Sequence, residues 1–288
     1  MRWIIKYYLI CIFLYAPFSI KANYPDSVFQ EADALFRNGK FFEAGIEYEY
    51  IAYYANNVLL KSRAQSKRID CFTQENKFEE AQHYAEKVSL MNVSDSLSFE
   101  IRYKKAFNAY LAGNFGEANS HFLQLKFFHP TKVDQKYSVY ILILNELNDY
   151  TKAKEELLAW IDNTQMPINQ HDSLKLLVQQ IYSQRNIPKL KSIERARLFS
   201  TFLPGSGQVY AGYPLEGIFN FTIHLATLAF AAEEIIAGYY ITGYFGGFGM
   251  FQKFYFGGIK RTEYLVNKTN YKRARKFNKE AKAFILEL

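Results

Sequence analysis

Four stretches of the sequence share one pattern: "NGKFFEA" at residues 38–44, "ENKFEEA" at 75–81, "AGNFGEA" at 112–118 and "LNDYTKA" at 147–153. Each stretch carries an aromatic residue that is followed three positions later by alanine. The aromatic residues are Phe41, Phe78, Phe115 and Tyr150, spaced 37, 37 and 35 residues apart, and the alanines are Ala44, Ala81, Ala118 and Ala153. A period of this length indicates a repeat architecture in which each unit is one small supersecondary structure.

Each repeated stretch has the composition of a turn between two helices. The residue two positions before the aromatic is Gly39, Asn76, Gly113 or Asn148. Glycine and asparagine tolerate the left-handed backbone that ends a helix. We expect the aromatic to fill the core of a helical hairpin and the alanine to let the two helices approach closely. The sequence therefore predicts an all-α fold.

The four units together resemble the tetratricopeptide repeat family over about residues 28–162. Residues 171–188 look like a further helix that closes the stack, which gives a repeat domain over residues 23–190. The resemblance implies a helical-hairpin solenoid whose concave face binds a peptide or a partner protein. A spacer or a scaffold of identical copies is the alternative reading of the same solenoid.

The stretch "LFSTFLPGSGQVYAGYPLEGIFNF" at residues 198–221 does not match the glycine loops of enzymes. A phosphate loop needs a lysine that this stretch lacks, and a dinucleotide loop needs glycine where Tyr210 stands. A nucleophile elbow would need glycine in place of Pro204. We therefore expect no catalytic residue, no cofactor site, no metal site and no enzymatic activity.

Two apolar segments follow, at residues 215–232 and 235–259, with Glu233 and Glu234 between them. Their lengths are close to the 20 or so apolar residues that cross a bilayer. We expect a transmembrane helical hairpin within residues 191–259, with the two glutamates at a wet turn. Small and polar residues at helical spacing are expected to bring the two helices together and to hydrogen-bond across the contact. These contact residues are Gly217, Asn220, His224 and Thr227 on the first segment and Gly238, Thr242 and Gly246 on the second.

The glycine-rich stretch is then interpreted as a tight turn where the chain meets the bilayer surface. Pro204 ends the preceding helix, because the residue before proline disfavours helical backbone. The residues of this turn motif are Pro204, Gly205, Gly207, Gln208, Tyr210 and Gly212. Together with the two segments, the motif resembles P-G-x-G-Q-x-Y-x-G in small, largely uncharacterised bacterial membrane-hairpin proteins, over about residues 190–280. That resemblance implies architecture and says almost nothing of activity.

The N-terminus has the pattern of an export signal over residues 1–22. Arg2 and Lys6 precede a short apolar core, and Ala22 is the small residue before the expected cleavage point. An uncleaved anchor is the alternative. A cleaved signal predicts that the repeats lie on the periplasmic side of a bacterial cell envelope. It would also leave Cys71 as the one cysteine, which excludes an intramolecular disulfide.

Residues 260–288 form the predicted basic C-terminal helix. The stretch from Lys253 to Leu288 holds ten Lys/Arg and three Asp/Glu, so it carries the whole net charge of +7. Next to a membrane segment, this mixture of basic and aromatic residues favours anionic lipid over nucleic acid. Basic residues also precede the hairpin, and the positive-inside tendency would put both flanks in the cytoplasm. That tendency conflicts with the export signal.

The sequence as a whole predicts an exported, membrane-anchored repeat scaffold that binds another cell-envelope protein. A small transporter or channel component is the alternative from a different class. In that reading Asn220, His224 and Thr227 would line a pore formed by several copies of the hairpin, because polar groups at membrane depth are rare without a function.

Overall fold

The structure is a computed structural model that describes residues 26–164 and 168–288. These residues are helical wherever they have regular structure, and no strand occurs among them, which confirms the all-α prediction. The contacts divide the chain after Asp134 into two compact units, referred to below as unit one and unit two. The predicted export signal at residues 1–22 lies outside the described residues.

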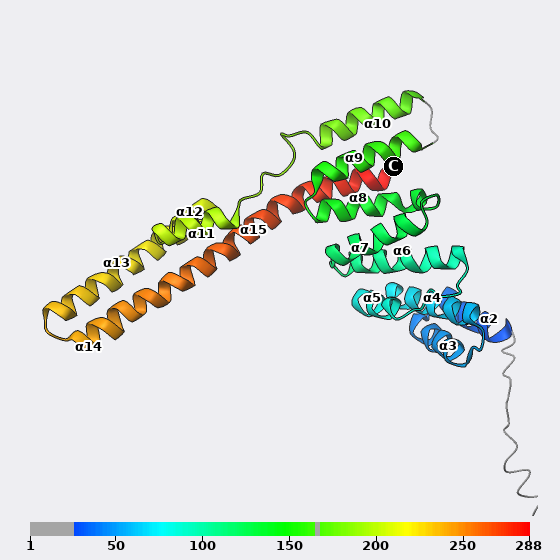
Figure 1. Ribbon diagram of the computed structural model, residues 1–288, viewed down its shortest axis with the longest axis horizontal. Coiled ribbons are helices and arrows are strands. Elements are labelled where there is room, and N and C mark those ends of the chain that lie inside the picture. Colours follow the sequence, from blue (N-terminus) through cyan, green and yellow to red (C-terminus); the bar gives the residue numbers. More distant parts are fainter. Residues whose placement is uncertain (1–25, 165–167) are drawn as a thin grey trace, which may run out of the picture. The chain divides into compact units, whose positions relative to one another are not determined.

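Unit one consists of consecutive helices, each packed on the next along the chain (Figure 1). They are α2 (Asp26–Arg37), α3 (Phe41–Tyr54), α4 (Val58–Gln74), α5 (Phe78–Glu86), α6 (Asp95–Leu111) and α7 (Phe115–Phe128). The first helices α2, α4 and α6 alternate with the second helices α3, α5 and α7. α4 also packs on α6, so first helices of neighbouring pairs touch.

The four repeated stretches form four turns of the same kind. Gly39, Asn76, Gly113 and Asn148 all have positive φ, from 59° to 81°. In the first turn the N–H of Gly39 bonds the Phe36 carbonyl and the N–H of Lys40 bonds the Leu35 carbonyl. The same pair of bonds recurs in the other three turns, and it satisfies carbonyls that a helix end leaves open. The left-handed turn predicted from Gly and Asn is therefore confirmed.

The helix after each turn begins at the repeated aromatic residue: α3 at Phe41, α5 at Phe78, α7 at Phe115 and, in unit two, α9 at Tyr150. The four repeated alanines are fully buried. The aromatic residues lie closer to the surface, since only Tyr150 is buried and the other three are half-buried. The centre of each helix pair is thus occupied by the alanine, and the aromatic ring covers its edge.

Unit two begins with a short 3-10 helix, η1 (Val133–Lys136), which spans the boundary, and continues with α8 (Tyr137–Glu146), α9 (Tyr150–Asn163) and α10 (Ile168–Ile181). α8 has the sequence YSVYILILNE, which is apolar on all sides. A helix of this kind must be covered on all sides. Eight of its ten residues are buried, and α9 and the end of the chain are among the elements that cover them.

The rest of unit two contains the predicted membrane region. Its helices are α11 (Ile193–Phe202), α12 (Ser206–Ala211), α13 (Pro214–Ile236), α14 (Tyr240–Thr242), the π-helix η2 (Gly243–Phe248) and α15 (Gly249–Glu287). α13 runs beside η2 and the start of α15 (Figure 1). Among the described helices, α13 is the one whose length and composition would suffice to cross a membrane.

The boundary between the two apolar segments differs from the sequence prediction. α13 continues through Glu233 and Glu234 to Ile236, and the chain turns at Gly238, which has φ of +86°. The glutamates therefore lie in the last turns of a helix, and the interruption predicted there is wrong. The helix continues because glutamate is a good helix former, whereas glycine supplies the backbone that reverses the chain.

The predicted basic tail is not a separate element. α15 begins at Gly249 and passes residue 260 without a break. Near its end, Phe277 makes edge-to-face contacts with Tyr150 of α9 at 4.8 Å and with Tyr182 at 5.5 Å between ring centroids. The Asn278 amide donates to the Glu146 carboxylate at 3.0 Å. One face of the tail is thus buried against α8, α9 and the residue that follows α10.

Candidate functional site

The glycine-rich turn motif packs at the base of the α13–α15 helix pair. α11 ends at Phe202, and Leu203 is extended because Pro204 follows it. Gly205 (φ +93°) and Gly212 (φ +102°) flank α12 with left-handed backbone, as expected for a tight turn. Both chain reversals at this turn therefore depend on glycine.

Two glycines of the motif also supply space. A Cβ on Gly205 would stand well inside van der Waals contact with the backbone of Gly217 in α13. A Cβ on Gly207 would collide with the Ala196 carbonyl and with the side chains of Ser200 and Thr262. α12 is therefore held tightly between α11, α13 and α15.

Gln208 is the buried polar residue of the motif, with only 2% of its surface exposed. Its Nε2 donates a long hydrogen bond of 3.4 Å to the Gly258 carbonyl of α15. Its Oε1 is buried and accepts no hydrogen bond from any residue that the structure describes. The backbone group that Gln208 bonds thus belongs to α15 and not to the turn motif itself.

Tyr210 connects the motif to the segment before α11. Its hydroxyl accepts from the Ser192 N–H at 3.2 Å, its ring packs on Phe199 at 5.3 Å, and the Lys191 ammonium lies 5.3 Å above the ring centre. The Lys191 ammonium also bonds the Tyr210 carbonyl. Tyr210 thus acts as a packing centre at the start of this region.

Several residues that hold the motif escaped the sequence analysis. Asn270 of α15 accepts from the Lys191 N–H and donates to the Lys191 carbonyl, both at 2.8 Å. Thr269 donates to the Ala211 carbonyl at 3.0 Å, and Ser200 bonds Thr262 at 2.9 Å. Asn270, Thr269 and Thr262 lie in the stretch whose basic and aromatic composition predicted contact with lipid. Their spacing in the sequence does not identify them as partners of the motif.

Of the small residues predicted at the contact on the second apolar segment, Gly246 lies there, but the closest approaches are at Gly243 and Gly247. A Cβ on Gly247 would collide with Ala231, and one on Gly243 would press on Ile235 and the Ala231 carbonyl. Gly246 lies near Phe230, but Thr242 is exposed. Gly238 forms the turn and has open space around it, so its predicted role in the contact is wrong. On α13, Gly217 faces Gly205 and Val209 of the motif.

The polar residues of α13 bond within their own helix. The His224 Nδ1 donates to the Asn220 carbonyl at 2.7 Å, and the Thr227 hydroxyl donates to the His224 carbonyl at 2.9 Å. The predicted hydrogen bonds across the helix pair do not occur among the described residues. His224 instead places its ring edge-to-face with Phe251, 5.1 Å between centroids, and its buried Nε2 has no hydrogen-bond partner.

A groove of about 390 Å³ opens beside Gln208, between α13 and α15. Its polar lining residues are Gln208, Glu216, Asn220, Lys253 and Arg261. Arg261 and Glu216, which both line the groove, form a two-pronged ion pair at 2.9 and 3.0 Å. The side chains of Lys253 and Asn220 make no hydrogen bond or ion pair within the described part of the chain.

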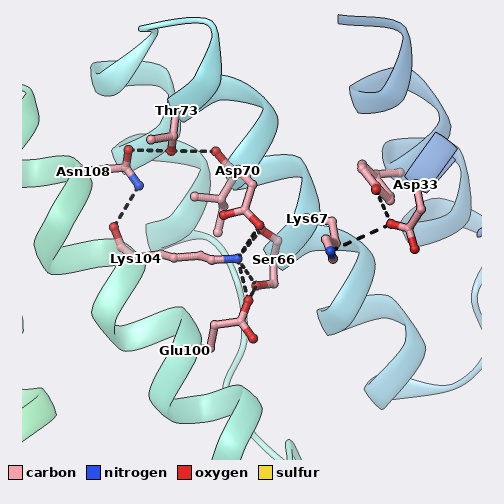
Figure 2. Close-up of polar contacts among 10 residues, drawn as sticks. Asp33, Ser66, Lys67, Asp70, Thr73, Glu100, Lys104 and Asn108 are labelled. Atoms are coloured by element: carbon pink, nitrogen blue, oxygen red, sulfur yellow. Dashed lines mark hydrogen bonds and ion pairs between the residues drawn. The ribbon is translucent and has the colours of Figure 1, made fainter. Parts of the chain in front are cut away.

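In unit one, a second polar cluster joins the first helices (Figure 2). The Lys104 ammonium of α6 points at α4, where it bonds Asp70 at 2.7 Å and both the hydroxyl and the carbonyl of Ser66 at 2.8 and 3.0 Å. It also bonds Glu100 on its own helix at 2.6 Å. An ammonium has three donors, so every donor of this buried lysine is satisfied.

The two carboxylates that share Lys104 differ in their pKa. Burial raises the pKa of Asp70, and the charge of Lys104 offsets this only in part. Burial also acts against ionisation of Glu100, but the charge and hydrogen bond of Lys104 bring its pKa below the ordinary value. Glu100 is the more exposed of the two, with 48% of its side-chain surface open against 29% for Asp70. The cluster thus presents an ionised carboxylate at the surface of α6.

Lys67 extends the same row of polar residues from α4 to α2, where it lies 3.8 Å from Asp33. Asp33 in turn accepts from the Tyr48 hydroxyl at 2.5 Å. Figure 2 shows Lys67 directed towards Asp33 and Lys104 directed towards Asp70 and Ser66. The first helices of three successive pairs are thus linked by polar contacts that reach the surface.

Neither region has the arrangement of a metal site. Among the residues described here, no group of three or more His, Cys, Asp or Glu side chains is placed to hold a metal ion. The thiol of Cys71 is fully buried in the core of unit one, and burial raises its pKa to about 12. A thiol in this state is not a nucleophile at neutral pH.

Comparison of the chain with protein-family models, with curated proteins and with solved structures finds no significant match.

Proposed function

We propose that this chain is a membrane-anchored helical-repeat scaffold that binds another protein of the bacterial cell envelope. One observation carries the proposal. α15 is a single helix of 39 residues whose start packs on the apolar helix α13 and whose end packs on α8 and α9. Such a helix ties an anchor to a repeat unit without a flexible linker.

The anchor is a transmembrane hairpin formed by α13 and by α14, η2 and the start of α15. In support, large apolar side chains of this pair are open to the surroundings: Leu215 is 82% exposed, Ile236 87% and Ile241 78%. Only 22% of the most apolar window of α13 is buried, whereas a core helix of a water-soluble protein is mostly buried. A lipid environment would cover these side chains.

The repeat part is of the tetratricopeptide type, with three helix pairs in unit one and the fourth, α8 and α9, in unit two. In support, the four turns share their left-handed residue, their hydrogen bonds and a fully buried alanine. Helix pairs that share these features can bury a core by repeating one interface with their neighbours.

The partner binds the polar face of α2, α4 and α6 in unit one. This face carries charges of both signs that are fixed in position and partly open, with Lys67 35% and Glu100 48% exposed. Side chains already held by hydrogen bonds lose little freedom when a partner binds. A segment of complementary charge pattern is the expected ligand.

Photo-crosslinking in cells tests this partner face. A photoreactive residue at Gln74, one helical turn after Asp70 on α4, should give one dominant adduct with another envelope protein. The same residue at Glu80 on the second helix α5 is the matched control and should give none. Lys67→Glu should weaken the adduct at Gln74. Equal labelling at both positions, or no adduct at either, would refute partner binding on this face.

Membrane topology tests the anchor. Because the end of α15 contacts α8 and α9, we expect an even number of crossings between them, so that the C-terminus and the repeats share one side. In a Cys11→Ser, Cys71→Ser chain, one new cysteine is placed after Leu288 or at Gln74. A membrane-impermeant thiol reagent should label both variants in intact cells. Labelling of only one variant would contradict the two-crossing hairpin, and protection of both would reverse its orientation.

A channel or transporter component is the second candidate, favoured by His224. Its unpaired Nε2 is buried at the depth of the apolar pair. A buried ionisable group at membrane depth is a candidate for ion or proton transfer. His224→Gln should abolish a transport phenotype at normal protein abundance if this candidate is right, and should leave a scaffold unaffected.

A further inference from the structure

We propose that the groove beside Gln208 binds a phospholipid whose head carries both a phosphate and hydroxyl groups. The groove was not predicted from the sequence, although its two cations, Lys253 and Arg261, belong to the basic stretch at residues 253–288. The inference rests on the proposed membrane anchorage for its setting.

Gln208 gives the main reason to expect a ligand. Its side chain is 98% buried, it lines the groove, and its Oε1 accepts no hydrogen bond. A buried acceptor that remains unpaired costs roughly 1–3 kcal/mol, so a ligand that donates a hydrogen bond here would recover that energy. A hydroxyl group is such a donor, and a carboxylate or an ester is not.

The charges of the groove favour an anionic group. Lys253 is exposed and has no ion-pair partner within the described residues, although it lies in an otherwise uncharged apolar stretch. Arg261 donates two of its five N–H groups to Glu216, so three N–H groups remain for a ligand. Lys253 and Arg261 are two turns, about 12 Å, apart along α15, and both line the groove. A phosphate between them would be bound from both sides.

The remaining lining is apolar and suits an acyl chain. Phe219 and Ile223 of α13 and Phe254 of α15 border the groove, and the absence of side chains at Gly257 and Gly258 keeps it open. In the proposed hairpin the Glu216–Arg261 pair lies on the side of the C-terminal tail and Lys253 lies two turns deeper, so the groove would extend from the bilayer surface into the apolar layer. A molecule with a phosphate head and a hydrocarbon tail matches this gradient.

The test uses the full chain in a phosphate-free maltoside detergent, with native mass spectrometry to count bound lipid. Dioleoyl-phosphatidylglycerol should give one saturable adduct. Lys253→Gln, an exposed position, should raise its dissociation constant about tenfold, as the loss of one charged hydrogen bond does. Gln208→Leu should do the same. Lys279→Gln, an exposed lysine on the same helix outside the groove, is the matched control and should change it less than about twofold.

Three further probes separate the parts of the proposal. Dioleoyl-phosphatidylcholine, which lacks a hydroxyl donor, and dioleoylglycerol, which lacks the phosphate, should bind at least about tenfold more weakly. Displacement of the lipid by millimolar inorganic phosphate would overturn the proposal, because the acyl chain would then contribute nothing. Equal binding to wild type and Lys253→Gln would overturn it as well. Resistance of the protein to carbonate extraction from membranes is measured in parallel, so that a failed anchor and an empty groove are distinguished.

Discussion

Gly39 and Gly113 in the repeat turns have nothing within 4 Å of the place where a Cβ would stand, whereas Gly205 and Gly207 in the turn motif have backbone oxygens well inside contact distance. In the repeats, glycine supplies only a left-handed backbone, and asparagine replaces it at Asn76 and Asn148. In the motif it also supplies room. The same residue type is therefore exchangeable in one region and required in the other.

Gly205→Ala should have the largest effect, because Gly205 combines both requirements. A methyl group would strain the backbone at φ +93° and would also press on the Gly217 backbone in α13. Strain and overpacking together should cost about 4 kcal/mol. Thermal melting of the full chain in detergent measures this loss. A change in melting temperature below about 2 °C would show that the two chain segments can separate freely.

Gly207→Ala isolates the requirement for room, because Gly207 has ordinary helical backbone within α12. Overpacking should cost about 2–3 kcal/mol in the same melting experiment. Ser200→Ala removes one of the colliding groups but leaves the Ala196 carbonyl in place. The double variant should therefore melt close to Gly207→Ala. Full recovery of the melting temperature in the double variant would mean that the movable Ser200 side chain, and not the Ala196 backbone, excludes a side chain at residue 207.

Gly39→Ala and Gly39→Asn isolate the requirement for left-handed backbone. Alanine should cost about 1 kcal/mol at this open position, since only its conformation is unfavourable. Asparagine should lower the unfolding free energy by only about a few tenths of 1 kcal/mol, as little as a substitution of an exposed residue does. The unfolding free energy of each variant in urea gives the comparison. Equal losses for the two substitutions would disprove the exchange of glycine for asparagine among the turns.

Gly116→Ala should reverse the sign. Gly116 lies in the first turn of α7, has no positive φ, and has nothing within 4 Å of its missing Cβ. Alanine removes conformational freedom from the unfolded chain and should stabilise the protein by about 0.5–1 kcal/mol. Urea unfolding again measures it, and Gly39→Ala is the matched control. Destabilisation by Gly116→Ala would mean that a contact not seen at this surface forms in solution.

The same contrast explains which parts of the fold were predictable. The four turns were read correctly because the residue at the turn, the aromatic and the alanine are close in sequence and the pattern occurs four times. The contact face of the second apolar segment was not read correctly, because the π-helix η2 holds more residues per turn than an α-helix. The closest approaches therefore fall at Gly243 and Gly247, Gly246 keeps a contact with Phe230, and Gly238 and Thr242 lie outside the contact.

The partners of the motif and of the tail could not be predicted for a different reason. Asn270 and Thr269 hold backbone groups that are 79 and 58 residues away in the sequence. The tail shows a readable apolar face with Phe277, Ala281 and Ile285, but the sequence does not say what covers that face. Its basic residues pointed to lipid, and the contact with anionic lipid remains a prediction for the exposed side of the helix. Long-range pairing of this kind leaves no local periodicity.

The burial of α8 by the last turns of α15 fixes an order of events during synthesis. Asn278 meets Glu146 across 132 residues, and Phe277 meets Tyr150 across almost as many. Until the ribosome has released the final residues, the isoleucines and leucines of α8 have no cover from that side. The apolar pair, which lies between α8 and these final residues, leaves the ribosome before α8 is covered. A chain that stops before Phe277 would leave α8 permanently open to aggregation and to quality-control proteases.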